Sequence, residues 1–373
     1  MKELLDDVPA YIRDLVPYPP GKPIEELERQ YGVKNPIKLA SNENSMGPSP
    51  AAVEHCKDSL AKLFRYPDGS GFYLKEALAG KFGIKQENIC LGNGSNELID
   101  FLCRVFIRPG RDAVSSRPSF LVYNKMVQVT GGTNRIVPLK NSRHDLHAIS
   151  SAVTSSTRLI FLDNPNNPMG TVIARGDFDR FLDDLPGHLL VVLDEAYGEF
   201  VRPGTDTPRG VDYIHTDPRV VTLRTFSKAY GLAGLRVGYG IMDSRICQLI
   251  ERVRQPFNVN LLAQEAARAA LEDTDHLEKT LANNHVEMER LSEELKAMGC
   301  RPLESQTNFM LVDTFRDAAQ VYEAMLYKGV IIRAMGAYGF PTFIRITVGL
   351  PQENQRFLQA FSQVLDQISV KER

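Results

Sequence analysis

The chain has 373 residues, of which 43% are hydrophobic and 24% charged, and its formal net charge is −2. This length allows two domains with sizeable cores, and the composition is that of an ordinary globular protein. The nearly balanced charge gives no indication of binding to nucleic acid or to an anionic membrane surface.

The cysteines and the N-terminus indicate a reducing compartment. The five cysteines are odd in number and form no CxxC pair, so neither a disulfide framework nor a zinc site is predicted. The opening residues MKELLDDVPAYIRDL mix acids and Arg13 with apolar residues, unlike a signal peptide, and no later run is long and apolar enough to span a bilayer. We therefore expect a soluble cytoplasmic protein.

The predicted elements begin with a proline-rich arm over residues 1–47, which contains PYPPGKP (17–23) and a short helix over EELERQYG (25–32). From residue 48 to 273, helical periodicity alternates with short apolar runs. Runs that are apolar on successive residues favour strands covered on both faces, as in a parallel sheet between helices. The strand candidates are 88–92, 158–163, 188–194, 219–225 and 235–241.

Residues 274–373 differ in texture. A long amphipathic stretch ends near Gly299, a plausible helix stop, and the strand candidates NFMLVD, GVIIRA and FIRITVG follow it. The predicted fold class is α/β, with a large domain over 48–273 that has a mostly parallel sheet between helices. We expect the arm (1–47) to join a smaller α+β domain over 274–373.

The segment LGNGSNELI (91–99) leads from a strand through glycines to Ser95 at a helix start. Free N–H groups at a helix N-terminus hold a phosphate well, and glycine permits close approach. Alternatively, Ser95 or Asn96 is only a helix cap. A dinucleotide fingerprint would need a third glycine where this chain has Glu97.

Two further segments place polar or aromatic residues at strand ends. RPSFLVY (117–123) puts Phe120 where its ring could cover a planar cofactor or join the core. DNPNNPMG (163–170) follows a strand, at the end where open α/β sheets keep their ligands. Its Asn167 could donate to a phenolate oxygen or fix the turn.

An acid ends the next apolar strand, in VVLDEAYGEF (191–200). A buried carboxylate is costly without a cationic partner, so Asp194 is either a helix cap or the partner of a buried cation such as a protonated pyridine nitrogen. Three residues later, Tyr197 can lie on the same side of the turn.

The segment LRTFSKAYGLAGLRVGYG (223–240) places Ser227 and Lys228 at a strand end and Arg236 at the entry to another strand. A lone lysine is normally a solvated surface charge. At the end of a buried strand, however, desolvation and nearby cations lower its pKa and make it nucleophilic toward a carbonyl. The Arg236 guanidinium suits a phosphate, although an ordinary strand and turn is the alternative.

In this order, the motifs resemble those of fold-type-I pyridoxal-phosphate enzymes, and within them the class I/II aminotransferases. The resemblance implies that Lys228 forms an aldimine with pyridoxal 5'-phosphate and that Asp194 keeps its ring nitrogen protonated. It implies ring contacts from Tyr197, Asn167 and Phe120. It also implies a phosphate site made by Ser95, Asn96, Ser227 and Arg236, and a carboxylate fork, Arg345, in FIRITVG.

The resemblance narrows to histidinol-phosphate aminotransferases through four segments: PYPPGKPIEELERQYG, KLASNENSMGPSP (38–50), RYPDGSGFYLKEALA (65–79) and GVIIRAMGAYGFPTFIRITVG (329–349). It implies transamination between L-histidinol phosphate and 2-oxoglutarate in histidine biosynthesis. It further implies a homodimer in which Tyr66 reaches the partner's cofactor phosphate, with Tyr18 and Arg333 near the substrate's phosphate end. Two positions depart from the pattern: Phe120 stands where many members have Tyr, and Met169 where Thr is usual.

Other functions remain open on the same scaffold. An aromatic-amino-acid aminotransferase and a threonine-phosphate decarboxylase would use the same lysine. A pyridoxal-phosphate-sensing regulator would need a DNA-binding domain, for which the arm leaves no evident room. The histidines of HDLH (144–147) have no apparent third partner for a metal, and we expect both to be solvated.

Overall fold

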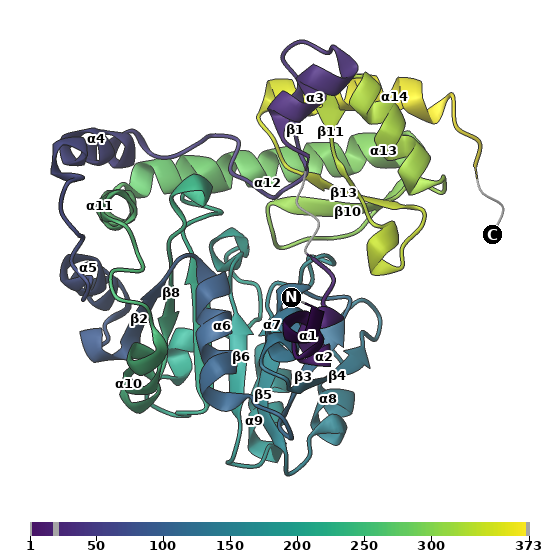
Figure 1. Ribbon diagram of the computed structural model, residues 1–373. Helices are drawn as coiled ribbons and strands as arrows, with labels where there is room; N and C mark the ends of the chain where they lie inside the picture. Colours follow the sequence, from purple (N-terminus) through teal and green to yellow (C-terminus); the bar gives the residue numbers. More distant parts are fainter. Residues whose placement is uncertain (1, 18–21, 371–373) are drawn as a thin grey trace.

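A seven-stranded sheet forms the centre of the large domain in this computed structural model, which describes residues 2–17 and 22–370 (Figure 1). Five neighbouring strands run parallel, and β8 lies antiparallel to both of its neighbours. The order across the sheet is β2 (Ile89–Gly92), β8 (Gly238–Ile241), β7 (Val220–Thr225), β6 (Leu190–Asp194), β5 (Thr157–Asp163), β3 (Asp112–Arg117) and β4 (Thr133–Pro138). The predicted α/β fold with a mostly parallel sheet is confirmed.

Helices cover both faces of this sheet, which explains its continuous apolar runs. In β5, Leu159 and Phe161 face a cluster with helices α6 (Ser95–Phe106), α7 (Val122–Val129) and α10 (Ser244–Val253). Ile160 and Leu162, on the opposite face, pack with α8 (Leu146–Ala152) and α9 (Arg175–Asp184). Along the β2 and β8 edge pack α4 (Pro50–Ser59), α5 (Phe72–Phe82) and α11 (Leu261–Glu272).

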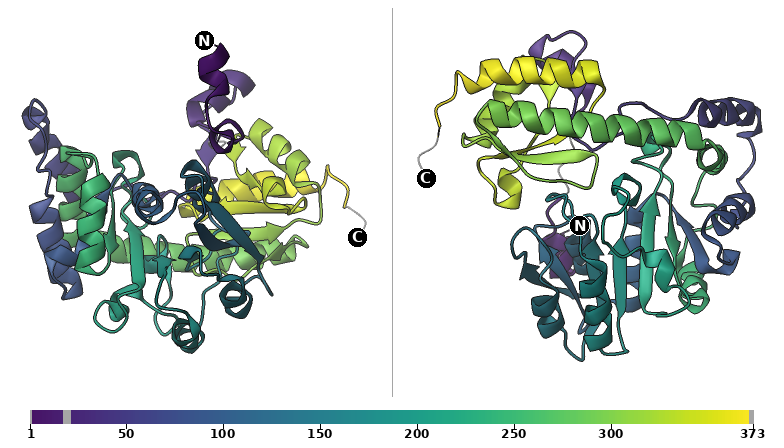
Figure 2. Two further views of the ribbon diagram at one scale, coloured as in Figure 1. Left: turned by 60° about the horizontal axis from the view of Figure 1, so that its bottom comes forward. Right: turned by 180° about the vertical axis from the view of Figure 1, so that it is seen from behind.

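The small domain contains a four-stranded antiparallel sheet in the order β12 (Arg333–Ala334), β13 (Phe343–Thr347), β10 (Phe309–Asp313) and β9 (Arg301–Pro302). Its core packs against α12 (Thr274–Ala297), α13 (Ala318–Tyr327) and α14 (Pro351–Leu365). Helix α12 runs from the side of α11 into the small domain, as Figures 1 and 2 both show. It ends just before Gly299, whose φ of 78° stops a helix.

The N-terminal segment contacts both domains. Strand β1 (Ile37–Lys38) pairs in parallel with β11 (Val330–Ile331), and Leu39 belongs to the small-domain core. Helix α3 (Ile24–Tyr31) packs beside α13. Helices α1 (Lys2–Asp6) and α2 (Ala10–Arg13) lie instead on the large domain, where Gln128 Nε2 on α7 donates to the Tyr11 carbonyl at 3.3 Å (Figure 1).

Three local expectations differ from the structure. GVIIRA forms two short strands in different sheets, β11 and β12. The strand predicted at 235–241 begins only at Gly238, because Leu235 ends a short 3-10 helix and Arg236 has a φ of 60°. Strands β3 and β4 were not among the candidates. Over the described residues, every helix is too short or too polar to cross a bilayer.

Candidate active site

A cavity of about 360 Å³ lies where β5, β6 and β7 end, with the small domain closing its other side. Most of the predicted site residues line it, although they come from distant parts of the chain. They are Ser95, Asn96, Phe120, Asn167, Asp194, Tyr197, Ser227, Lys228, Arg236, Arg333 and Arg345. The carboxyl ends of parallel strands therefore gather the motifs, as expected for an open α/β sheet.

One end of the cavity is built to hold an anion. Gly94, with φ of 74°, precedes the first residue of α6, and Arg236 Nη1 donates to Ser227 Oγ at 3.3 Å. A Cβ on Gly94 would stand 2.7 Å from Arg236 Nη2, and one on Gly238 would stand 2.6 Å from the Ser95 nitrogen. Only glycine lets the guanidinium and the helix N-terminus approach so closely, and together they form an anion cradle.

Lys228 and Arg236 come from the same turn, which joins β7 to the antiparallel β8. The Lys228 Nζ donates to the Ser41 carbonyl at 3.1 Å. Burial, together with the nearby Arg345 guanidinium, lowers the Lys228 pKa to about 8. About a tenth of the amine is therefore neutral at pH 7, and this neutral form is able to attack a carbonyl.

Asp194 is buried at the end of β6 and accepts two hydrogen bonds. The Tyr123 hydroxyl donates to Oδ2 at 2.8 Å, and the Ala196 N–H donates to Oδ1 at 3.2 Å. Burial nevertheless raises the Asp194 pKa to about 7, in part offset by the Tyr123 hydrogen bond. A cation placed against this carboxylate would favour its charged form.

Tyr123 is a site residue that the sequence motifs did not reveal. It is buried on α7, stacks on Phe161 with ring centroids 4.8 Å apart, and meets Phe120 edge-on at 5.6 Å. It therefore supports both the Phe120 ring and the Asp194 carboxylate. Its position one helical turn after Phe120 was the available signal.

Asn42, in the N-terminal arm, is a second residue that the motifs did not reveal. Its Nδ2 donates to the Tyr197 hydroxyl at 2.8 Å, and its backbone N–H donates to Thr347 Oγ1 at 2.9 Å. It is buried with a φ of 56°, and Asn308 Nδ2 donates to its carbonyl. Asn42 thus joins Tyr197 of the large domain to β13 of the small domain.

The small domain contributes two arginines to the cavity. Arg345 is buried, and it donates through Nη1 to Asn167 Oδ1 at 2.6 Å and through Nη2 to the Ala40 carbonyl at 3.1 Å. Arg333 lies directly opposite Arg345 in the β12–β13 pairing. The cavity wall opposite the sheet is therefore strongly cationic.

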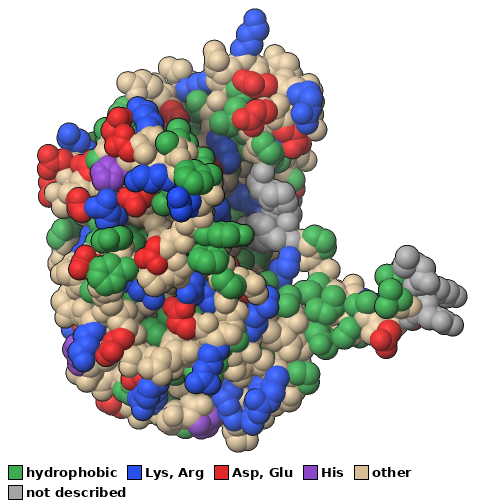
Figure 3. All heavy atoms as spheres, turned by 60° about the vertical axis from the view of Figure 1, so that its left-hand side comes forward, with side chains coloured by type: hydrophobic (Ala, Val, Ile, Leu, Met, Phe, Trp, Pro, Cys, Tyr) green, Lys and Arg blue, Asp and Glu red, His purple; other side chains and the backbone are tan. Residues whose placement is uncertain are grey.

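Tyr66 is a predicted site residue that does not line this cavity. Tyr66 is 82% exposed and stacks on Phe257 with ring centroids 4.8 Å apart. Figure 3 shows the face that carries α4 and α5, where apolar side chains gather on the surface. The exposed apolar residues of this region include Leu60, Leu63, Phe64, Phe72 and Tyr73. Tyr18 lies outside the described residues.

The described part of the chain contains no cluster of three or more His, Cys, Asp or Glu side chains arranged to hold a metal ion. The expectation that both histidines of HDLH are solvated is wrong for one of them. His147 is exposed, whereas the His144 side chain is only 2% exposed and contacts Ser116 and Asp163.

Comparison with known proteins gives consistent results. The chain is 51% identical over 365 residues to the histidinol-phosphate aminotransferase of Desulfotalea psychrophila, covering 97% of this chain and 96% of that protein. It is 46% identical to the Moorella thermoacetica protein of the same name, over 95% of this chain and 92% of the other.

A solved structure is similar over nearly the whole length. It is the histidinol-phosphate aminotransferase of Sinorhizobium meliloti in complex with pyridoxal-5'-phosphate, with a TM-score of 0.89, 31% identity, and coverage of 97% of this chain and 98% of that one. The family described as aminotransferase class I and II matches residues 34–361. This chain belongs to the aminotransferase class I and II family.

Proposed function

We propose that this chain is a pyridoxal-phosphate-dependent aminotransferase that moves the amino group between L-histidinol phosphate and 2-oxoglutarate, giving imidazole-acetol phosphate and glutamate in histidine biosynthesis. The supporting observation is the convergence, in one cavity, of the Lys228 amine, the Asp194 carboxylate, the Arg236 anion cradle and the Arg333–Arg345 pair. The names of the relatives with the highest identity agree with this proposal.

The residues of the cavity fit pyridoxal phosphate. Its phosphate requires N–H donors and a cation, which the start of α6 and Arg236 supply. Its pyridine nitrogen requires an acid, and Asp194 is a buried carboxylate on the cavity wall whose pKa is raised by burial. Its aldehyde requires an amine, which is Lys228. When bound, the cofactor supplies an electron sink for the bonds at the substrate carbon.

The hydrogen bonds of Tyr197 and Asn167 leave both residues able to donate to the ring oxygen of the cofactor. The Tyr197 hydroxyl already accepts from Asn42, so its own proton is available. The Asn167 Oδ1 accepts from Arg345, which orients the amide so that its NH₂ group is the free end. Phe120, held edge-on by Tyr123, would lie over the ring face.

The cationic wall suits both amino donors. Histidinol phosphate has no carboxylate at its reacting carbon and carries its negative charge on a distant phosphate, whereas glutamate carries two carboxylates. An arginine fork binds carboxylate and phosphate with the same bidentate geometry. We assign Arg345 to the group beside the reacting carbon and Arg333, with Tyr18, to the far end.

The proposed assembly is a cytoplasmic homodimer in which Tyr66 reaches the cofactor phosphate of the partner. Tyr66 does not line the cavity of its own chain, and it lies in an exposed apolar region, which a second copy of the chain would cover. Within each chain, we propose an arm over 1–47, a large cofactor-binding domain over 48–273 and a small domain over 274–373.

The decisive experiment is a set of half-reactions. The cofactor-loaded protein is mixed separately with histidinol phosphate, phenylalanine and threonine phosphate, and the absorption band of the lysine-bound cofactor is followed. Rapid loss of the band with histidinol phosphate supports the proposal, with Lys228→Ala as the inactive control. Preference for phenylalanine would indicate an aromatic aminotransferase, release of carbon dioxide from threonine phosphate would indicate a decarboxylase, and cofactor binding without turnover would indicate a sensor.

A further inference from the structure

A second buried carboxylate stands beside Asp194. Asp163 ends β5 directly opposite Asp194 in the parallel pairing of β5 and β6, and it also touches the cavity. Its carboxylate accepts hydrogen bonds from three groups: Ser119 Oγ at 2.7 Å, Asn166 Nδ2 at 3.0 Å and the Asn167 backbone N–H at 2.8 Å. His144 Nε2 lies 3.2 Å from the same carboxylate. Asp163 is therefore the anchor of the turn that carries Asn167.

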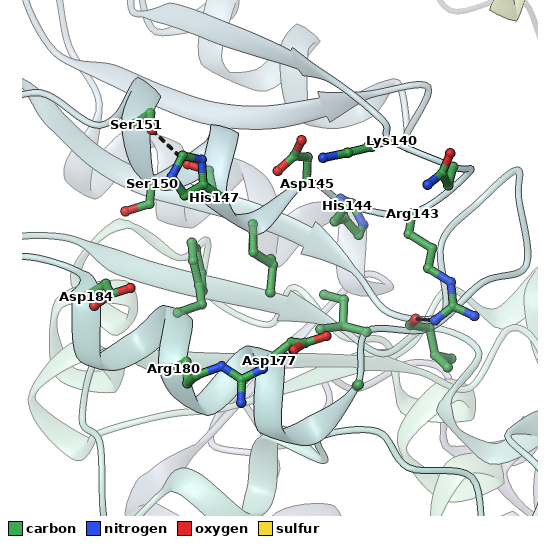
Figure 4. A pocket seen from close by; sticks show the side chains of 16 residues that line it. Lys140, Arg143, His144, Asp145, His147, Ser150, Ser151, Asp177, Arg180 and Asp184 are labelled. Carbon is green, nitrogen blue, oxygen red and sulfur yellow. Dashed lines mark hydrogen bonds and ion pairs between the residues drawn. The ribbon is translucent and has the colours of Figure 1, made fainter.

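His144 reaches Asp163 from outside the cavity. It follows β4 and lines a surface groove of about 760 Å³ between α8 and α9, where Figure 4 shows it beside Lys140, Arg143 and Asp145. This groove is larger than the proposed active-site cavity and separate from it. The His144 imidazole is the point at which the groove approaches the buried hydrogen bonds of Asp163.

The contacts of His144 determine which nitrogen bears a proton. Its Nε2 faces two acceptors, the Asp163 carbonyl at 3.0 Å and the Asp163 carboxylate at 3.2 Å, so Nε2 must donate. Its Nδ1 lies 2.7 Å from Ser116 Oγ on β3. Both ring nitrogens are thus engaged, and the ring is fixed between two strands of the sheet.

A continuous path of contacts leads from this ring to the substrate side of the cavity. His144 Nε2 donates to the Asp163 carbonyl and lies 3.2 Å from its carboxylate, which accepts from the Asn167 backbone N–H. The Asn167 side chain in turn accepts from Arg345. The same turn is also tied from outside, because Thr171 Oγ1 donates to the Ser142 carbonyl at 2.7 Å. These contacts connect His144 to the turn that carries Asn167.

We propose that His144 is a positioning residue, which holds Asp163 and thereby sets where Asn167 presents its amide to the cofactor ring. This inference rests on the proposed cofactor for its readout. Removing the ring takes a hydrogen-bond donor from the Asp163 carbonyl and a polar neighbour from its buried carboxylate, and the turn that carries Asn167 loosens. Substitution of His144 should therefore change the absorption of the bound cofactor. It should also slow the half-reactions with both amino donors to the same extent.

The test compares His144→Leu, His144→Gln and Ser116→Ala with the wild-type holoenzyme. A weaker donor at the ring oxygen makes the lysine-bound nitrogen hold its proton more firmly, so the pH midpoint of the cofactor absorption should rise by about half a unit in His144→Leu. Turnover should fall roughly 3- to 10-fold in both half-reactions. Glutamine can place an N–H near Asp163 and should restore most of the loss, while Ser116→Ala should show a smaller shift in the same direction.

Loss of stability alone is controlled by Ile149→Ala, which removes buried side-chain volume from α8 in the same wall of the groove. Melting temperatures are measured on cofactor-free protein for every variant. A structural role would make Ile149→Ala and His144→Leu alike in both stability and absorption, and that result, or an unchanged midpoint in His144→Leu, would overturn the inference. A wild-type protein without a cofactor band would instead refute the proposed function.

Discussion

Arg333 and Arg345 stand directly opposite each other on β12 and β13, so their side chains leave the sheet on the same face. Two like charges in this position are destabilising in the absence of an anion. Both side chains line the proposed active site, and Arg345 is buried. An anion bound between the two arginines would relieve their mutual repulsion. Substitutions at these two positions therefore test how the substrate is recognised.

If Arg345 faces the reacting carbon and Arg333 the distant phosphate, their alanine variants should differ in effect. Arg345→Ala should harm the glutamate half-reaction more, and Arg333→Ala the histidinol-phosphate half-reaction more. Loss of one charge-assisted contact should lower the specificity constant by about ten- to a hundredfold. Lysine at either position should rescue poorly, because it cannot form the bidentate fork.

The matched control for these variants is Arg301→Ala, which removes an exposed arginine paired with Asp313 on the same sheet. It should leave both half-reactions unchanged. Equal damage to the two half-reactions by Arg333→Ala and Arg345→Ala would contradict the assignment of the two ends.

Lys228 should be the residue that binds the cofactor covalently. Reduction with borohydride should fix the cofactor to the peptide containing Lys228, and Lys81→Met should not change this result, although burial lowers the Lys81 pKa as well. Because the Lys228 pKa is about 8, the neutral fraction of the amine is about a tenth at pH 7 and rises through pH 8. The rate of cofactor capture by cofactor-free protein should increase over this range and then level off. If the reduced cofactor were found on a different lysine, the assignment of Lys228 would be wrong.

Asp194→Asn should still bind the cofactor but lose most turnover, on the order of a hundredfold or more, because an amide cannot keep the ring nitrogen protonated. Steady-state kinetics on protein with verified cofactor content would measure this. Near-normal turnover would show that Asp194 does not act on the ring.

Cofactor-free protein provides an independent test of the Asp194 environment. The Asp194 pKa is raised from 3.8 to about 7, so between these values the folded state binds more protons than the unfolded state, and stability falls as pH rises. The full penalty above pH 7 is at most roughly 4 kcal/mol. Asp194→Asn should therefore unfold at a higher temperature than wild type at pH 8, and the difference should vanish below pH 4. If the melting temperatures of the two proteins changed with pH in the same way, the buried Asp194 carboxylate would not be destabilising.

Tyr66 should act across a subunit interface. Tyr66→Ala and Lys228→Ala homodimers should both be nearly inactive, whereas mixed subunits should regain up to roughly a quarter of wild-type activity, because each heterodimer contains one site with both residues intact. Lys228→Ala mixed with Asp194→Ala is the negative control, since both residues line the same chain's cavity. After verified exchange of subunits, no recovery in the first mixture would place Tyr66 in its own chain's site.

The sequence was informative where a residue's role depends on its immediate neighbours. Asp194 is the last residue of one strand and Lys228 closely follows another. Their position where the parallel strands end could therefore be predicted from the sequence alone. Contacts between segments that are distant in the sequence could not be predicted in this way. The Asn42–Tyr197 hydrogen bond joins residues 155 positions apart, and no local pattern announces it.

Local pattern also failed where tertiary packing overrides it. GVIIRA is uniformly apolar up to its arginine, yet β11 pairs with the arm and β12 with β13. Strand β4, TNRIVP, is half polar and mostly exposed because it lies at the sheet edge. Arg236 adopts a left-handed backbone before β8, where its guanidinium must reach Ser227 and the start of α6.

The connection between β7 and β8 carries both Lys228 and Arg236, so it fixes the distance between their side chains. The separation between the amine and the guanidinium is set within the connection between these two paired strands, and no residue of the small domain takes part in that connection. A phosphorylated aldehyde of matching length would engage both ends at once, whereas pyridoxal without its phosphate would engage only the amine. One connection thus sets the distance between the two groups that we assign to the ends of the cofactor, whereas the two arginines that we assign to the substrates come from the small domain.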